Sequence, residues 1–364
     1  MMRTTNEHRP ALVEVARGSI VESQHHGALV VAAPDGRIIA GVGDPDWVTY
    51  LRSAAKPFQA LAVVESGAAD HFGLTERELA VICGSHAAEP QHLEAVRSIL
   101  SKIGLREDAL RCGAHMPIHE ETARSLLCTG QSPQPIHHNC SGKHGGMLAL
   151  CRYWGAEVAT YLEPDHPVQV ANRRVVAEMA GLRPEELIIG IDGCSVPTFA
   201  LPLRAAARAY ARLCDPRDLP PARQAACRRI VAAMQAYPEM VGASKGNLDS
   251  DLMRIADGRV VSKGGAEGFQ GVGVLPRAGR PALGLALKVE DGLGERARGL
   301  ATVEALRQLH VLDEDDLRAL ARYGRRPLHN WRGMPVGELR PLLTLRLEVE
   351  HGESTPSDQV NPWR

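Results

Sequence analysis

Arg52-Ser53-Ala54-Ala55-Lys56-Pro57 stands where a strand-like beginning of the chain gives way to a mostly helical middle. If a helix begins at Ser53, the side chain of Lys56 lies one turn later on the same face. Pro57 supports a helix start, because proline is tolerated only in the first turn of a helix. The lysine amine then activates the serine hydroxyl, and backbone N–H groups at the helix start stabilise an oxyanion. The segment predicts a Ser–Lys catalytic pair, although Ser and Lys three residues apart is also a common accident.

On both sides of this segment the sequence pattern changes. Before it, two strand-like runs flank the turn Pro34-Asp35-Gly36, which predicts a hairpin of Ala28–Ala32 and Arg37–Gly41. After it, a spacing of apolar residues near 3.6 predicts helices over Gln91–Lys102, Val168–Ala180 and Arg223–Tyr237. Beyond Gly258 strand patterns return at Arg259–Ser262, Phe269–Leu275 and Leu283–Glu290, followed by helical patterns at Glu295–His310 and Asp313–Tyr323.

This order predicts an α+β fold, with one antiparallel sheet built from both chain ends and a helical middle region packed against it. A cleft is expected where the two parts meet. We expect a single catalytic unit over residues 1–350, with its sheet part at about 11–52 and 255–350 and its helical part at about 53–254. The last residues, 351–364, are expected to form a loose tail.

The composition is that of an ordinary globular protein. Of the 364 residues 44% are apolar and 23% charged, and the formal net charge is −1. A charge so near zero favours neither nucleic acid nor an anionic membrane as a partner. No apolar run approaches the roughly 20 residues that span a bilayer, and Met1–Pro10 is too polar for a signal peptide. These features predict a cytoplasmic protein, whose eight cysteines, with no Cys-x-x-Cys pair, are reduced and either buried or metal ligands.

Lysine is rare in this chain: only six of its 42 lysine and arginine residues are lysines. An amine can lose its proton, act as a base or bind a metal, whereas a guanidinium keeps its charge. Lys56, Lys143 and Lys263 lie in short segments rich in Ser, Gly, Cys and His. Genomic composition explains the scarcity of lysine but not this placement, so these three are candidates for chemistry.

Two further motifs follow the Ser53/Lys56 pair in the order seen in serine β-lactamases and penicillin-binding proteins. Gly84-Ser85-His86 comes after an apolar run, and Lys263-Gly264-Gly265 begins a strand region, as the Lys-Thr-Gly motif of those enzymes does. Taken alone, Ser85 is more typical of a serine turn. Together, the order of the motifs predicts that Ser85 and Lys263 join Ser53 and Lys56 in one site.

A third cluster combines the segment from His137 to Met147 with Asp192-Gly193-Cys194. Cysteines and histidines grouped in this way suggest a zinc site that includes Cys140 and Cys194. Lys143 as a neutral amine, His144 or water are candidates for the remaining ligands. The alternative is two buried cysteines beside a glycine-rich turn.

These motifs resemble those of the class 3, or Rhizobium etli-type, L-asparaginases of the asparaginase II family. The resemblance runs from about Leu12 to Val349 and is most specific in Asn139-Cys140-Ser141-Gly142-Lys143-His144-Gly145-Gly146-Met147. Other matching segments are Arg52–Pro57, Asp192–Cys194 and Leu287-Lys288-Val289-Glu290-Asp291-Gly292. The resemblance implies a fold like that of serine β-lactamases and glutaminases, a homodimer, and hydrolysis of L-asparagine to L-aspartate and ammonia.

The resemblance also implies roles for individual residues. Ser53 becomes the nucleophile with Lys56 as its base, and Ser85 with Lys263 becomes a second Ser–Lys pair. The residues implied to hold a zinc ion that assists substrate binding are Cys140, Lys143 and Cys194, and those implied to line the substrate pocket are Arg52, His144 and Asp192.

Other functions stay open from the residues alone. The same site would suit a glutaminase or another Ser–Lys amidase of the β-lactamase type. A zinc hydrolase would instead attack with metal-bound water, and a non-catalytic amino-acid sensor would need neither a nucleophile nor its base.

Overall fold

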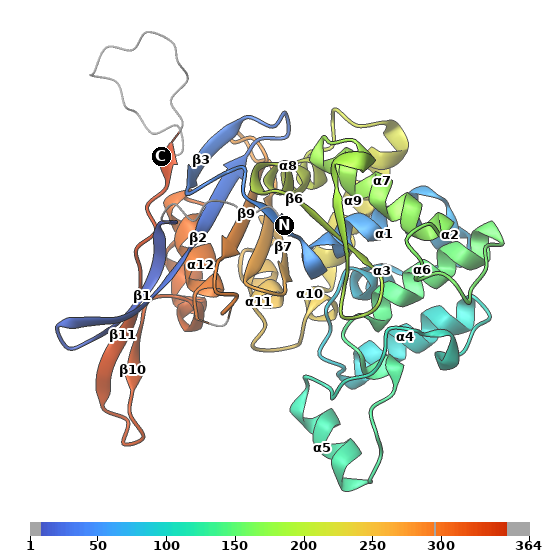
Figure 1. Cartoon of the computed structure of the whole chain (residues 1–364), viewed down its shortest axis with the longest axis horizontal. Coiled ribbons are helices and arrows are strands. Elements are labelled where there is room, and N and C mark those ends of the chain that lie inside the picture. Colours follow the sequence, from blue (N-terminus) through green and yellow to red (C-terminus); the bar gives the residue numbers. More distant parts are fainter. Residues whose placement is uncertain (1–8, 295, 348–364) are drawn as a thin grey trace.

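Strands from both ends of the chain pair in one antiparallel sheet in the computed structural model, which describes residues 9–294 and 296–347 (Figure 1). The N-terminal strands are β1 (Ala11–Arg17), β2 (Ile20–Ala32) and β3 (Ile38–Val42), and the C-terminal strands are β7 (Val260–Gly265), β8 (Phe269–Val274), β9 (Leu283–Val289), β10 (Arg326–His329), β11 (Pro335–Pro341) and β12 (Arg346–Leu347). Their order is β10-β11-β1-β2-β9-β8-β7, and β3 pairs with β2 and β12. The predicted α+β fold is thereby confirmed.

The predicted hairpin at the start of the chain is confirmed as β2 and β3. Its register pairs Leu29 with Val42, and its turn is closed by Gly36, whose N–H donates to the carbonyl of Ala33 at 3.0 Å. Gly36 has a φ of +97°, which only glycine adopts readily.

Helices cover both faces of the sheet. α8 (Leu203–Cys214) packs on β2, β8 and β9 on one face, and α12 (Arg298–Gln308) packs on β1, β8, β9 and β11 on the other. Successive side chains of β2 alternate between two apolar clusters, with Val30 in the α8 cluster and Leu29 and Val31 in the α12 cluster. Both faces of the central strands are therefore buried, which explains their continuous apolar runs.

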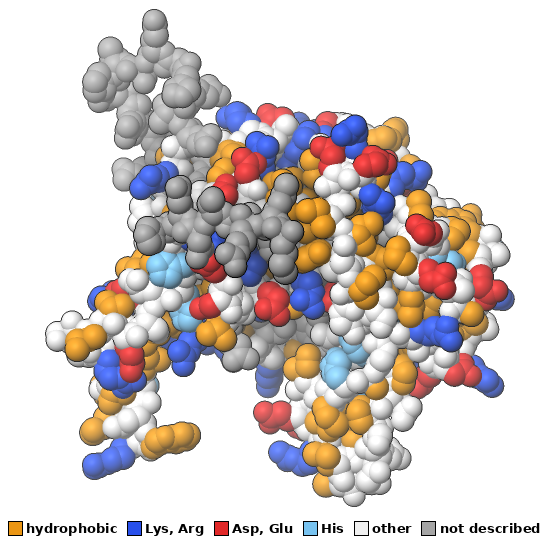
Figure 2. All heavy atoms as spheres, viewed as in Figure 1, with side chains coloured by type: hydrophobic (Ala, Val, Ile, Leu, Met, Phe, Trp, Pro, Cys, Tyr) orange, Lys and Arg blue, Asp and Glu red, His pale blue; other side chains and the backbone are white. Residues whose placement is uncertain are grey.

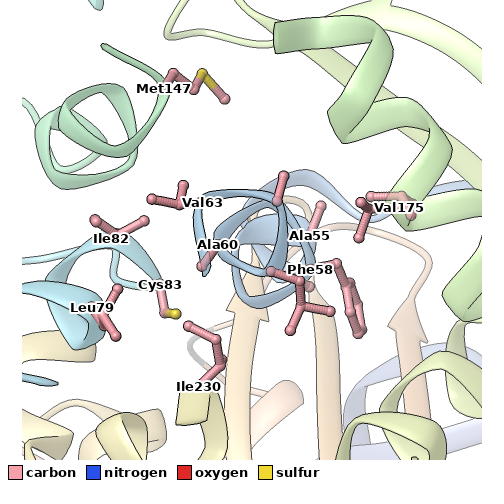
Figure 3. Close-up of a cluster of buried hydrophobic side chains, with 14 of the residues drawn as sticks. Ala55, Phe58, Ala60, Val63, Leu79, Ile82, Cys83, Met147, Val175 and Ile230 are labelled. Atoms are coloured by element: carbon pink, nitrogen blue, oxygen red, sulfur yellow. The ribbon is translucent and has the colours of Figure 1, made fainter. Parts of the chain in front are cut away.

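The helical part is organised around α1 (Lys56–Glu65), which is buried on all sides from Lys56 to Val63. Its neighbours are α3 (Glu76–Ile82), α6 (Ser141–Trp154), α7 (Pro167–Ala180) and α9 (Pro221–Ala236). Figure 3 shows Ala60 and Val63 of α1 among side chains from these helices, and Phe58 beside Val175. A helix that is apolar almost all around is typical of such a central position, so the start of α1 is fixed from several directions.

The helices predicted from apolar periodicity are confirmed as α4 (Pro90–Lys102), α7 and α9. The His166 side chain caps α7 by accepting from the Val168 N–H, and Gly181 ends it with a φ of +71°. The shorter helices of the described residues are α2 (Ala68–His71), α5 (Glu120–Cys128), α10 (Pro238–Val241), α11 (Leu248–Ile255) and α13 (Glu314–Ala319).

A small sheet inside the helical part differs from the helical pattern expected there. It has the order β4-β6-β5 and consists of β4 (Val48–Tyr50), β6 (Pro197–Pro202) and β5 (Ile188–Ile191). These strands are short, so periodicity could not distinguish them from the surrounding loops. These strands matter for the site because the loop between β5 and β6 carries Asp192 and Cys194, two of the predicted site residues.

Acidic, basic and apolar side chains are intermixed on the face drawn in Figure 2, as the near-zero net charge leads one to expect. Among the described residues, no helix is both long and apolar enough to cross a membrane. The tail predicted at 351–364 lies outside the described residues.

Candidate active site

The residues of the predicted site lie where five segments of the chain meet. These are the turn before α1, the end of α3, the start of α6, the β5–β6 loop and the end of β7. The turn contacts β7 so closely that a Cβ on Gly265 would lie 2.3 Å from the Leu51 carbonyl oxygen. At the start of α6 a Cβ on Gly142 would lie equally close, 2.3 Å, to the carbonyl oxygen of Val81 on α3. Glycine at these two positions therefore allows the segments to approach one another.

The segment with the Ser–Lys spacing is a turn followed by a helix. Residues Arg52–Ala55 form a 3₁₀ turn, and α1 begins at Lys56 and not, as predicted, at Ser53. Pro57 still lies in the first turn of α1, as its missing N–H requires. In a 3₁₀ turn residues i and i+3 eclipse, so Ser53 and Lys56 keep a common side. Ser53 is half-buried, and within the described residues its hydroxyl makes no hydrogen bond.

Lys56 is buried and its amine is held by three oxygen atoms. Nζ lies 2.6 Å from the Gly84 carbonyl oxygen, 2.8 Å from Ser85 Oγ and 3.4 Å from the Asn139 carbonyl oxygen. The structure thus brings Lys56 into direct contact with Ser85, the second predicted serine. Ser85 is itself fixed by its N–H, which donates to the Val241 carbonyl at 2.8 Å.

Lys263, at the end of β7, is buried and donates to the Gly264 carbonyl at 2.8 Å. Its second contact is Asp249 Oδ2 at 3.4 Å, and no hydrogen bond joins it to Ser85 within the described residues. Burial lowers the pKa of Lys263 to about 8, and the positive charge of Lys56 adds to this effect, while the carboxylate of Asp249 opposes it. The amine can therefore exchange a proton close to neutral pH.

Asp249 is a site residue that the sequence analysis missed. It lies in the first turn of α11, where an acidic residue normally indicates only a helix N-terminus. The structure buries it beside Lys263. Burial raises its pKa, but Lys263, Arg298 and hydrogen bonds outweigh burial and lower it to about 2. No pattern in the sequence signals this contact, because it depends on how α11 packs on β7.

Arg52, the first residue of the 3₁₀ turn, forms an ion pair with Asp192 of the β5–β6 loop. Arg52 Nε lies 2.9 Å and Nη2 2.8 Å from Asp192 Oδ1. The same oxygen accepts from the Gly193 N–H at 2.7 Å. Both side chains are half-buried, so this predicted pair remains accessible to a small polar molecule.

The predicted metal ligands also lie together. Lys143 Nζ is 3.0 Å from Cys194 Sγ, and all three of Cys140, Lys143 and Cys194 are buried. A hydrogen bond from Cys194 lowers the pKa of the Cys140 thiol well below its usual value, with help from Lys56 and Lys143. Burial lowers the pKa of Lys143, but the two sulfur atoms outweigh burial and raise it above its ordinary value.

The two cysteine sulfur atoms suit a zinc ion, but a lysine amine is not one of its usual ligands, and Lys143 would first have to lose the proton that its raised pKa retains. Among the residues that the structure describes, no group of three or more His, Cys, Asp and Glu side chains could hold a metal ion. A metal at this place would therefore need Lys143 as its third protein ligand.

His144 points away from bulk water. Its Nδ1 lies 2.6 Å from the Tyr161 hydroxyl, and its buried Nε2 has no hydrogen-bond partner within the described residues. Burial, followed by the charge of Lys143, lowers its pKa well below the usual value, so the ring is neutral. The Tyr161 oxygen also accepts from the Arg111 N–H at 2.9 Å. In the tautomer in which the Tyr161 hydroxyl donates to Nδ1, the ring proton of His144 is on Nε2.

One protein family and several solved structures are similar to this chain. The family model of L-asparaginase II matches residues 13–341. No curated protein sequence matches the chain. Glutaminase YbgJ of Bacillus subtilis, solved as a covalent complex with 5-oxo-L-norleucine, is 16% identical with a TM-score of 0.36, and the match covers 78% of this chain and 85% of that chain.

Two other solved structures are similar to the same degree. A probable glutaminase from Bacillus subtilis is 14% identical with a TM-score of 0.37, covering 78% of this chain and 82% of that chain. Mglu is 16% identical with a TM-score of 0.41, covering 86% of this chain and 72% of that chain. At these TM-scores the structural similarities carry no inference about substrate.

Proposed function

Because this chain belongs to the L-asparaginase II family and is an amidohydrolase, we propose that it hydrolyses the side-chain amide of L-asparagine to L-aspartate and ammonia. The observation that carries the proposal is the buried amine of Lys56, which lies one turn after Ser53 and contacts Ser85 at 2.8 Å. A buried lysine bound to a serine hydroxyl is suited to proton transfer rather than to surface charge.

In the proposed mechanism Ser53 attacks the amide carbon and its proton passes to Lys56. The tetrahedral intermediate collapses as the leaving nitrogen takes up a proton. Ammonia departs, and a β-aspartyl ester remains on Ser53. Water then attacks the ester, gives up a proton to the same apparatus and releases aspartate. The free hydroxyl of Ser53 supports its role as nucleophile, and the Lys56 contact supports Ser85 as a proton relay. Lys263 is proposed to serve as the second base.

The charged ends of asparagine match the polar groups around the turn. The Arg52 guanidinium suits the α-carboxylate, because it offers paired N–H donors, and the Asp192 carboxylate suits the α-ammonium. The unpartnered Nε2–H of His144 is a third candidate donor for the substrate, since a buried donor without a partner costs about 1–3 kcal/mol.

We further propose that zinc is held by Cys140, Lys143 and Cys194. Zinc bound there would supply a Lewis acid that polarises and orients a substrate oxygen. Two thiolate ligands donate charge and blunt this acidity, so we assign it a role in binding and leave the proton transfers to the lysines.

Glutamine is the main alternative substrate, because it differs from asparagine by one methylene, and one methylene is worth only about 1–3 kcal/mol in a pocket. The homodimer and the cytoplasmic location implied by the resemblance and the composition stay predictions. Sedimentation of the purified protein tests the first of them.

The test of the proposed function is ammonia release measured side by side with asparagine, glutamine and a β-lactam, with zinc present. We expect asparagine to be the fastest substrate and Ser53→Ala to be inactive. Lys102→Arg is the matched control, because Lys102 is an exposed lysine that pairs with Glu78 away from the site. Binding of asparagine without any turnover by the wild-type protein would contradict the proposal and favour an amino-acid sensor.

A further inference from the structure

Asp249 is surrounded by hydrogen-bond donors from outside its own helix, α11, so an N-terminal position on that helix does not account for its contacts. Its Oδ1 accepts from Ser262 Oγ and Gln270 Nε2, both at 2.8 Å. Its Oδ2 accepts from the Gly264 N–H at 2.8 Å and faces Lys263 Nζ at 3.4 Å. A carboxylate has about four lone-pair positions, so all of them are directed at these partners.

The donors hold Asp249 more tightly than Lys263 does. Three contacts of 2.8 Å come from groups on β7 and β8, whereas the contact with the lysine amine is 0.6 Å longer. The Lys263 amine donates its closer hydrogen bond to the Gly264 carbonyl oxygen, at 2.8 Å. The carboxylate is thus a fixed negative charge that the amine faces, and the third N–H position of Lys263 is left for another partner.

A purely structural role is a poor explanation for this network. Burying two opposite charges costs several kcal/mol per ion before their attraction is counted, and apolar residues of similar volume often replace such a pair without loss. The network also leaves Gln270 Oε1 and Arg298 Nε buried without a hydrogen-bond partner among the residues that the structure describes. A group of charges that costs stability and borders a catalytic lysine is more typical of a functional site.

The charges that face Lys263 act in opposite directions. Burial, Lys56 on α1 and Arg298 on α12 favour the neutral amine, and Asp249 alone among the principal influences favours the ammonium. Other titratable groups near the lysine are Cys83 at the end of α3 and Tyr210 on α8, whose hydroxyl faces the Lys263 carbonyl. Both have raised pKa values, chiefly because of burial, and stay neutral. The result is the Lys263 pKa of about 8.

We propose that Asp249 is a positioning residue for the reaction, which orients the Lys263 amine and keeps its proton available for exchange during catalysis. The inference rests on the amidohydrolase function proposed above and adds a residue that acts only through Lys263. Without the carboxylate, the amine would stay neutral to lower pH and would lose one of its two fixed contacts.

The scarcity of lysine makes a direct test practicable. With ¹³C-labelled lysine ε-carbons the chain gives signals from only six side chains, and Lys263→Met assigns the signal of Lys263 by its loss. In Asp249→Asn we expect the titration of Lys263 to move to lower pH by about one unit or more. The limb of the kcat/KM profile near pH 8 should move in the same direction, with a lower kcat.

Ser262→Ala is the matched control. It removes a hydrogen bond to Asp249 Oδ1 but leaves the Oδ2 side that faces the lysine, so we expect lower thermal stability with an unmoved Lys263 titration. If Asp249→Asn does not fold, Arg298→Gln replaces it as the test variant. Loss of the positive charge of Arg298 should move the titration of Lys263 to higher pH. Unchanged titration of Lys263 in the variant that folds would overturn the inference. Absence of turnover in the wild-type protein would instead overturn the proposed function, whatever the titration shows.

Discussion

Two buried lysines in this molecule have pKa values that are shifted in opposite directions. Lys263 belongs to the Ser–Lys region, which we define as Ser53, Lys56, Ser85 and Lys263, and its pKa is lowered to about 8. Lys143 belongs to the thiol region, defined as Cys140, Lys143 and Cys194, and its pKa is raised. Burial lowers the pKa of both, so their neighbours decide the outcome.

The difference lies in what surrounds each amine. Lys263 has cationic neighbours in Lys56 and Arg298 and one carboxylate, so its proton is exchangeable near neutral pH. Lys143 faces two sulfur atoms and Asp192, which hold its proton unless another cation replaces it. This difference supports our proposal of proton transfer for the Ser–Lys region and of cation binding for the thiol region.

Removing the nucleophile is the largest change that this comparison predicts. Ser53→Ala should lower kcat by several orders of magnitude, because covalent catalysis would be lost. Its melting temperature should match the wild-type protein, since the Ser53 hydroxyl makes no hydrogen bond with the described residues. Single-turnover kinetics and thermal unfolding measure the two effects. If Ser53→Ala turned over substrate at close to the wild-type rate, the Ser–Lys region would have no role in the chemical step.

The base in the Ser–Lys region is tested by charge-conserving substitution. Lys56→Arg should be nearly as damaging as Lys56→Ala, because a guanidinium keeps the charge but accepts no proton; we expect a loss of roughly 10²–10⁴-fold in kcat. Lys102→Arg, whose pair with the buried Glu78 lies away from the site, should retain activity. Substantial activity in a folded Lys56→Arg protein would mean that Lys56 serves as a fixed charge.

The ion pair of Arg52 with Asp192 should affect binding rather than chemistry. Asp192→Asn removes one charge from the Arg52 pair and should raise KM by roughly 10–100-fold, as expected for a charged hydrogen bond of about 1.5–3 kcal/mol. Glu107→Gln, which breaks the exposed pair with Arg97, should leave KM unchanged. A fall in kcat at constant KM would place Asp192 in the chemical step.

The smallest effect on kcat is expected from the thiol region. Removal of metal by a chelator, checked by elemental analysis, should raise KM and leave kcat within about tenfold, or roughly 1.4 kcal/mol. Cys194→Ser should have the same effect, whereas Cys227→Ser, a buried cysteine on α9, should not. Loss of kcat that added zinc restores would favour attack by metal-bound hydroxide. Protein that binds no zinc would leave Cys140 and Cys194 as buried thiols.

Local patterns predicted most of the fold. The hairpin around Gly36 and the helices α4, α7 and α9 follow from turn chemistry and apolar spacing, which depend on neighbours in the sequence. The small sheet of β4, β5 and β6 was missed because its strands are too short to show a period. The beginning of α1 was placed three residues early, because a 3₁₀ turn and an α-helix start share the same Ser, Ala and Pro preferences.

The site was only partly predictable for a different reason. Ser53, Lys56 and the segment at Cys140 carry recognisable motifs, and the structure brings Cys194 and Asp192 to them from the β5–β6 loop. The hydrogen-bond partners of the site lysines, however, depend on how the helices and strands pack. The order of the motifs predicted that Lys56 and Ser85 share one site, but no local pattern specified their direct contact. The contact of Lys263 with Asp249 joins the successive elements β7 and α11 and depends on how these two pack.

Labelling with the diazo ketone analogue of asparagine tests whether covalent chemistry belongs to the Ser–Lys region. Intact mass and peptide mapping of the treated protein would locate the adduct. We predict one label per chain on Ser53, complete loss of activity, and no label in Ser53→Ala. A protein that stays fully active and unlabelled while it hydrolyses asparagine, or one labelled at Ser85 instead, would contradict the assignment.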